Sequence, residues 1–138
     1  MAVIQTRPGA EAWIAPTWPR QPVDPDRCYV SYHPPADELV VFFGGKPVPS
    51  YSAPIPAFGE HVAVMVDLAP DWASSTGEIV GIQGIPFVGG ALPDHPEWSS
   101  LVGTDEEARR AALARFLADV AAVVALNGAS GTAPDGPR

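Results

Sequence analysis

The side chains that most suggest chemistry lie together in the loop over residues 94–98, which contains Asp94, His95 and Glu97. Imidazole nitrogens and carboxylate oxygens are ligands for divalent metals, so these three residues, with His61 as a fourth, are candidate metal ligands. The loop also contains a proline, which stiffens it, and its acids are equally typical of a turn and a solvated charge. We therefore favour a structural role, and we keep a metal-assisted hydrolase or a small-ligand site as the alternative.

Four more polar residues lie where they could join such a site as ligands or as general acid–base partners. They are His33, Asp37, Glu38 and Asp67. His33 ends a predicted strand, as His61 opens one, so both histidines are interpreted as strand-end residues. The two aspartates stand where turns need side-chain acceptors for nearby backbone N–H groups.

Other catalytic patterns do not occur in the sequence. No Gly-x-Gly-x-x-Gly opens a helix, and neither Gly-Lys-Ser/Thr nor Gly-x-Ser-x-Gly is found. Cys28, the only cysteine, has no readable partner histidine and begins an apolar run, so we interpret it as a small buried hydrophobic residue. We predict no catalytic residue and no cofactor.

Charge and length narrow the class of protein. The chain has 138 residues, the size of one domain, and its 16 acidic and 8 basic side chains give a net charge of −8. This charge repels phosphate backbones and anionic membrane surfaces, so nucleic acid and membranes are not expected partners. No apolar stretch is long enough for a signal peptide or a membrane span, which predicts a cytoplasmic protein.

Residues 1–27 form a predicted extended arm because five prolines exclude a helix or a central strand. The arm carries Trp13 and Trp18, whose rings are costly to leave in water. It is therefore expected to pack on its own domain or on a neighbouring copy.

Short β-type runs follow the arm. Strands are predicted over residues 28–33, 38–43, 61–67 and 78–85, and their succession indicates an antiparallel β-meander. The second run is continuously apolar, which places it inside the sheet with both faces covered. Residues 46–60 contain four prolines and are given no regular structure, since they suit an extended excursion or a proline-tolerant edge strand.

A long helix is predicted over residues 105–126. Thr104 followed by three acids is typical of a capped helix start, and Asn127-Gly128 is a common stop. An apolar stripe at helical spacing should lie across the sheet and predicts an α+β fold. The stripe consists of Leu113, Phe116, Leu117, Val120 and Val124. Residues 127–138 are expected to be disordered.

The last turns of this helix are apolar on every side, so a second covering surface is expected in addition to the sheet. It is either the tryptophan-bearing arm or the same helix of another copy. The predicted interface residues are Val120, Val123, Val124, Leu126, Trp13 and Trp18. The first functional hypothesis is therefore a non-catalytic module that forms a homo-oligomer or binds a protein partner.

Three stretches, residues 32–41, 64–67 and 77–82, read Tyr-His-Pro-Pro-Ala-Asp-Glu-Leu-Val-Val, Val-Met-Val-Asp and Gly-Glu-Ile-Val-Gly-Ile. Together they resemble domain-of-unknown-function family 2283, a family of small β-meanders in largely bacterial proteins. The resemblance spans about residues 28–86 and implies a fold but no activity. His33 stands where the family usually has Asp, Gln83 where it often has Glu, and the connection from Asp67 to Gly77 is longer.

Overall fold

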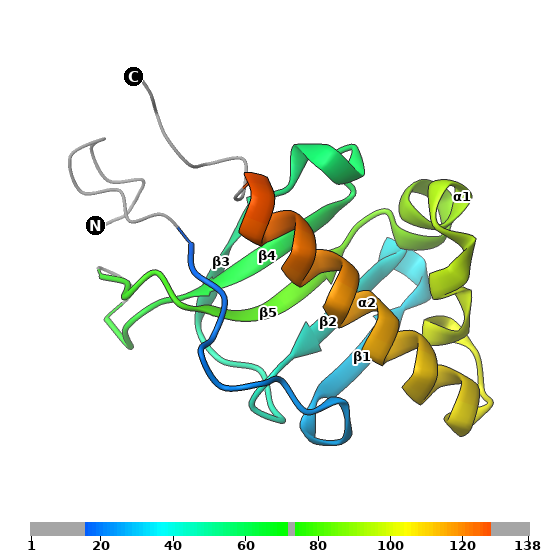
Figure 1. Ribbon diagram of the computed structural model, residues 1–138, viewed down its shortest axis with the longest axis horizontal. Helices are drawn as coiled ribbons and strands as arrows, with labels where there is room; N and C mark the ends of the chain where they lie inside the picture. The colour runs from blue at the N-terminus through cyan, green and yellow to red at the C-terminus, as the bar shows by residue number, and fades with distance from the viewer. Residues whose placement is uncertain (1–15, 72–73, 128–138) are drawn as a thin grey trace.

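The computed structural model describes residues 16–71 and 74–127 (Figure 1). Five strands form one antiparallel sheet, and a single long helix crosses one of its faces. The strands are β1 (Tyr29–His33), β2 (Glu38–Phe42), β3 (Ser50–Pro54), β4 (Val62–Asp67) and β5 (Ile79–Gly84). The helix is α2 (Glu106–Asn127), preceded by the short α1 (Leu92–Asp94) and the 3-10 turn Pro96–Val102. The predicted α+β class is confirmed.

The strand order is β1-β2-β5-β4-β3, so the sequential order of a simple meander is not observed. After β2, the glycines and prolines of residues 44–49 carry the chain away from its neighbour, and β3 and β4 form a second hairpin. The apolar strand β5 then fills the slot between β2 and β4. The predicted interior position of β2 is confirmed.

Strand β3 lies within the proline-rich residues 46–60, for which the sequence predicts no regular structure. Within the described part of the chain it pairs only with β4, and it forms one edge of the sheet. An edge strand tolerates proline because the missing N–H can face outward. Of the two alternatives for this stretch, the proline-tolerant edge strand is therefore the one that is observed.

The core lies between α2 and the sheet. All five residues of the predicted helical stripe are buried, as are the strand residues that alternate toward the helix. The main strand residues of this core are Leu39, Val41, Val62, Val64, Val66 and Ile82. The chain therefore has one covered face, which packs on α2, and one face that α2 does not cover.

The helix begins one residue later than the predicted start. Asp105, not Thr104, is the capping residue, because its carboxylate accepts a hydrogen bond from the Ala108 amide at 3.1 Å. Glu106 and Glu107 then occupy the first turn, where the helix dipole favours acids. None of the helices in the described residues is long and apolar enough to cross a membrane.

The described part of the arm packs on its own domain. The Thr17 amide donates to the Gly77 carbonyl at 2.8 Å, and the Ile79 amide donates to the Thr17 carbonyl at 2.9 Å. Trp18 lies against Phe43 with ring centroids 5.2 Å apart. Trp13 and residues 128–138 of the predicted disordered tail lie outside the described residues, and the tail's first residue, Asn127, is instead the last residue of α2.

Candidate functional site

The loop that carries the candidate metal ligands forms an aromatic stack. The His95 ring lies parallel to Trp98, with centroids 4.1 Å apart, and its Nδ1 is 3.2 Å from a Glu97 carboxylate oxygen. Trp98 is fully buried, and its indole N–H donates to the Asp119 carboxylate at 2.9 Å. The loop therefore closes one end of the core, which is the structural role favoured from the sequence.

The four predicted ligands do not converge. Only His95 and Glu97 contact each other, whereas the His61 ring packs against Gly90, where an added Cβ would lie 2.9 Å from the ring. Within residues 16–71 and 74–127, no group of three or more His, Cys, Asp or Glu side chains is placed to hold a metal ion. The four predicted ligands therefore do not form a metal site in the described residues.

Asp37, in the turn between β1 and β2, holds the loop after β5 by hydrogen bonds. One carboxylate oxygen accepts from the Tyr32 hydroxyl at 2.7 Å and from the Val88 amide at 2.8 Å, and the other accepts from the Gly89 amide at 2.8 Å. The Tyr32 hydroxyl, followed by these amides, lowers the pKa of Asp37, and the same carboxylate raises the pKa of Tyr32. Asp37 has the turn-acceptor role predicted for it.

Asp67 does the same for the connection between β4 and β5. Its Oδ1 accepts from the Ser75 hydroxyl at 3.1 Å, the Thr76 amide at 3.1 Å and the Thr76 hydroxyl at 2.9 Å. The longer connection is thereby fastened to the end of β4. This second turn-acceptor prediction is also confirmed.

The predicted interface residues fall into different environments. Val120 and Val124 are buried in the molecule's own core and are not free for a partner, and Val123 is half-buried beside them. Leu126 is 82% exposed at the end of the helix. Trp18 is half-buried against Phe43, so its ring is engaged within the chain.

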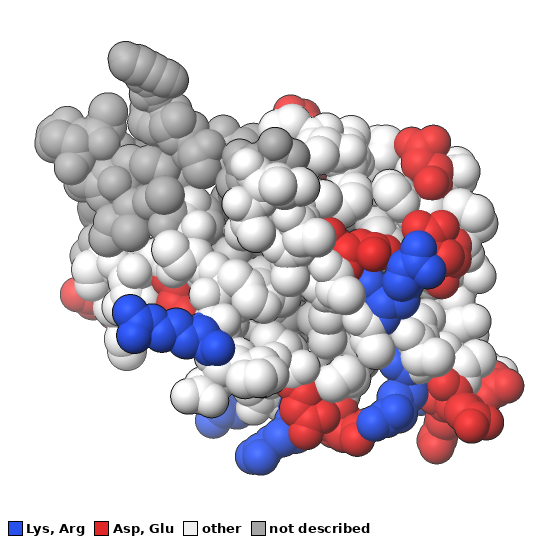
Figure 2. Space-filling view, viewed as in Figure 1, with Lys and Arg blue, Asp and Glu red and all other residues white. Residues whose placement is uncertain are grey.

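Charged side chains on the helix side of the molecule adjoin one another and do not form a basic patch. Asp26 pairs with Arg110, and Asp119 pairs with Arg115 at 3.1 Å. Figure 2 shows blue and red side chains in contact around the N-terminal half of α2, with a largely uncharged surface between them and the far end of the helix. This surface lacks the concentrated positive charge that a phosphate backbone requires.

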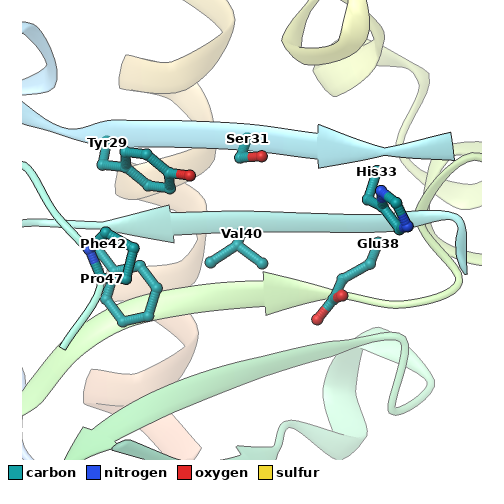
Figure 3. A pocket seen from close by; sticks show the side chains of 7 residues that line it. All are labelled: Tyr29, Ser31, His33, Glu38, Val40, Phe42 and Pro47. Carbon is teal, nitrogen blue, oxygen red and sulfur yellow. The ribbon is translucent and has the colours of Figure 1, made fainter. Parts of the chain in front are cut away.

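The sheet face opposite α2, here called the open face, holds a depression of about 360 Å³ (Figure 3). It is lined by Tyr29, Ser31, His33, Glu38, Val40, Phe42 and Pro47. These residues alternate along β1 and β2, and the register sets Tyr29 opposite Phe42, Ser31 opposite Val40 and His33 opposite Glu38. Figure 3 shows the aromatic side chains and Pro47 at one end and His33 with Glu38 at the other.

A chain of hydrogen bonds fixes the polar end of this depression. The Ser52 hydroxyl donates to Gln83 Oε1 at 2.8 Å, and Gln83 Nε2 donates to Glu38 Oε2 at 2.5 Å. Because Ser52 occupies the amide oxygen, the Gln83 amide nitrogen must face the carboxylate. Glu38 is half-buried and forms no ion pair with any side chain of the described residues.

Phe42 is only 5% exposed although α2 does not cover it. Its register partner on β5 is Gly81, and a Cβ there would lie 3.3 Å from the Phe42 ring. The ring lies over the glycine and forms a flat apolar floor beside Tyr29, with ring centroids 6.4 Å apart. Gly81 therefore has a packing role in this surface.

Sequence reasoning missed most of this surface. The continuously apolar run of β2 predicted two covered faces, but Val40 is half-buried on the open face. The usable signal was the hairpin register, because pairing residues 29–33 with 38–42 places Tyr29, Phe42 and Glu38 on one side.

Comparison with known proteins found no matching family model, no matching curated protein and no matching solved structure.

Proposed function

We propose that this protein is a non-catalytic assembly module that forms a homodimer through the outer edge of β1. One observation carries the proposal. Among the described residues the sheet has two edges, β1 and β3, and of these two strands only β3 contains a proline, a residue that limits pairing with another chain.

The hydrogen-bond pattern gives the direction of each main-chain group in β1. The Phe43 amide donates to the Val80 carbonyl at 2.9 Å. In β2 the main-chain N–H and C=O groups of odd-numbered residues therefore point toward β5, and those of even-numbered residues point toward β1. The N–H and C=O groups of Val30 and Tyr32 therefore point outward from β1. They have no backbone partner among the described residues.

The two edges differ in how they are protected. The main-chain groups of Ser50, Ser52 and Pro54 face outward from β3, and Pro54 has no N–H to offer. Prolines flank both strands, so the difference lies within the strands themselves. Strand β1, with the sequence Tyr-Val-Ser-Tyr-His, contains neither proline nor lysine nor a carboxylate.

Strand β1 is also complementary to itself. In an antiparallel pair centred on Ser31, Val30 of one copy lies opposite Tyr32 of the other. These are the residues whose main-chain groups point outward, and each such pair exchanges two hydrogen bonds. The two sheets would then form one continuous sheet with closed two-fold symmetry.

The test compares two serines that share the open face but lie on opposite edges. Ser31→Lys places two like charges directly opposite each other at the two-fold axis, whereas Ser52→Lys on β3 does not. We expect size-exclusion chromatography with light scattering to show a dimer for the parent protein and Ser52→Lys, and a monomer for Ser31→Lys. Mixing Ser31→Lys with Ser31→Glu should restore a heterodimer.

A second variant tests whether the dimer contact is instead the exposed C-terminal end of α2. Leu126→Asp should leave the dimer intact if β1 is the contact, and it should give a monomer if the exposed end of α2 is the contact. A parent protein that stays monomeric at all concentrations, or a Ser31→Lys variant that still dimerises, would contradict the β1 proposal.

The alternative, a metal-assisted hydrolase or small-ligand site at residues 94–97, has less support because His95 is stacked on Trp98 and no group of three or more potential ligands in the described residues is placed to hold a metal ion. Membership of domain-of-unknown-function family 2283 and a cytoplasmic location stay predictions from the sequence.

A further inference from the structure

The polar end of the depression on the open face consists of His33 and Glu38, which lie opposite each other on β1 and β2 (Figure 3). Gln83 holds one carboxylate oxygen of Glu38, and Ser52 holds Gln83 in turn. The second oxygen, Oε1, has no hydrogen-bond partner among the described residues. A half-buried carboxylate without a counter-ion is satisfied best by a charge-assisted hydrogen bond from an ammonium or guanidinium group.

The opposite end is apolar. The Tyr29 and Phe42 rings lie side by side next to Pro47, and Val40 forms the floor between these rings and Glu38 (Figure 3). Tyr29 is 37% exposed, so a ligand lying here would cover aromatic surface that is now in water. Residues 38 and 42 are about 13 Å apart along the strand, at about 3.3 Å per residue.

From this arrangement we propose that the depression binds a small organic cation with an aryl or alkyl body. The cationic head lies at Glu38, and the body extends over Val40 to Tyr29 and Phe42. Anionic ligands of the same shape are excluded by the Glu38 carboxylate and by the net charge of −8.

This site shares strand β1 with the proposed dimer, in which Tyr29 of one copy would lie opposite His33 of the other. Pairing at β1 uses main-chain groups at the edge of the sheet, whereas the ligand contacts side chains on the open face. Binding and assembly are therefore measured separately, and each proposal fails on its own experiment.

The direct experiment is an amide NMR titration of the full chain with 4-phenylbutylamine. Two matched probes accompany it: 4-phenylbutanoate, which keeps the body but reverses the charge, and n-butylamine, which keeps the head but lacks the ring. We expect saturable shifts at Ser31, Val40 and Phe42 with a Kd of about 1 mM or tighter. The carboxylate should cause none, and butylamine should bind about tenfold more weakly.

Two variants test which residues contact the cationic head and the apolar body of the ligand. Glu38→Gln keeps an acceptor for Gln83 but removes the charge, and it should weaken binding about tenfold, or about 1.4 kcal/mol. Tyr29→Ala should weaken it about threefold through loss of ring contact. Glu78→Gln removes an exposed acid immediately before β5; it is the matched control and should bind like the parent.

Circular dichroism melting curves establish that each variant is folded. Equal binding of the carboxylate probe, unchanged affinity in folded Glu38→Gln, or shifts that stay linear with concentration would each overturn the proposal.

Discussion

The two faces of the sheet consist of alternate residues of the same strands, yet one face is a continuous apolar core and the other is partly polar. On β2, Leu39 and Val41 face α2 and are buried in a continuous apolar core. Their neighbours Glu38 and Val40 face the open side, where a carboxylate, an imidazole and two aromatic rings line one depression and Gln83 hydrogen-bonds the carboxylate. Stability explains the covered face, whereas the open face has an arrangement that stability does not require.

Glycine makes both faces possible on the central strand β5. Gly81 leaves room for Phe42 on the open face, and Gly84 leaves room for Phe87 on the covered face, where a Cβ would lie 2.6 Å from its ring. These two glycines therefore allow an aromatic ring to pack on each side of the sheet.

The largest expected effect is the difference in unfolding free energy lost when a side chain is truncated on each face. Phe116→Ala removes a fully buried ring that contacts Trp98 and Phe87, so the free energy of unfolding should fall by about 4 kcal/mol. Val40→Ala, on the open face, should lower it by about 1 kcal/mol or less. Urea denaturation followed by circular dichroism measures both, and similar losses in the two variants would remove the distinction between the faces.

The next effect concerns the glycine under Phe42. Gly81→Ala places a Cβ 2.3 Å from the Val41 carbonyl oxygen, so the backbone must shift, at a cost of about 3 kcal/mol. Gly44→Ala is the matched control because nothing lies within 4 Å of its Cβ position. If both variants unfold at the same urea concentration as the parent, the close approach of β2 and β5 at Gly81 is not rigid.

Much of the covered face is predictable from the sequence, because it depends on local periodicity. The spacing of Leu113, Phe116 and Val120 identifies the buried side of α2 before any tertiary contact is known. Strand runs rich in Val and Ile identify β2, β4 and β5 for the same reason.

The open face and the strand order depend on long-range pairing, which local patterns do not encode. Gln83 reaches Glu38 only because β5 returns beside β2, and Ser52 joins them from a strand hidden among prolines. Conversely, Asp94, His95 and Glu97 are close in sequence, but ring stacking on Trp98 sets the orientation of His95. Proximity along the chain is a poor guide to which side chains converge.

A third test uses pH at the turn that joins β1 to β2. Asp37 has its pKa lowered by Tyr32 and by two loop amides, so its contribution to stability is full above its unfolded pKa and disappears as the pH falls through the folded value. Asp37→Asn keeps a residue suited to φ of 51° but removes the charge. Its melting temperature should be lower than the parent's at pH 7, and the difference should shrink below about pH 4. Asp94→Asn is the control, because the described residues give Asp94 no such side-chain hydrogen bonds, and its melting temperature at pH 7 should equal the parent's.

The last prediction concerns the reactivity of Cys28 and has no effect on stability. Cys28 lies just before β1, at the margin of the covered face. Burial, with a smaller effect from Asp24, raises the pKa of this thiol to about 11. Because the thiolate is the reactive form, alkylation by iodoacetamide at pH 8 should be about a hundredfold slower than for a thiol with a pKa of about 9. Unfolding the chain in urea should restore the ordinary rate, which identifies burial as the cause. A native rate within threefold of the unfolded rate would show that the covered face does not extend to this residue.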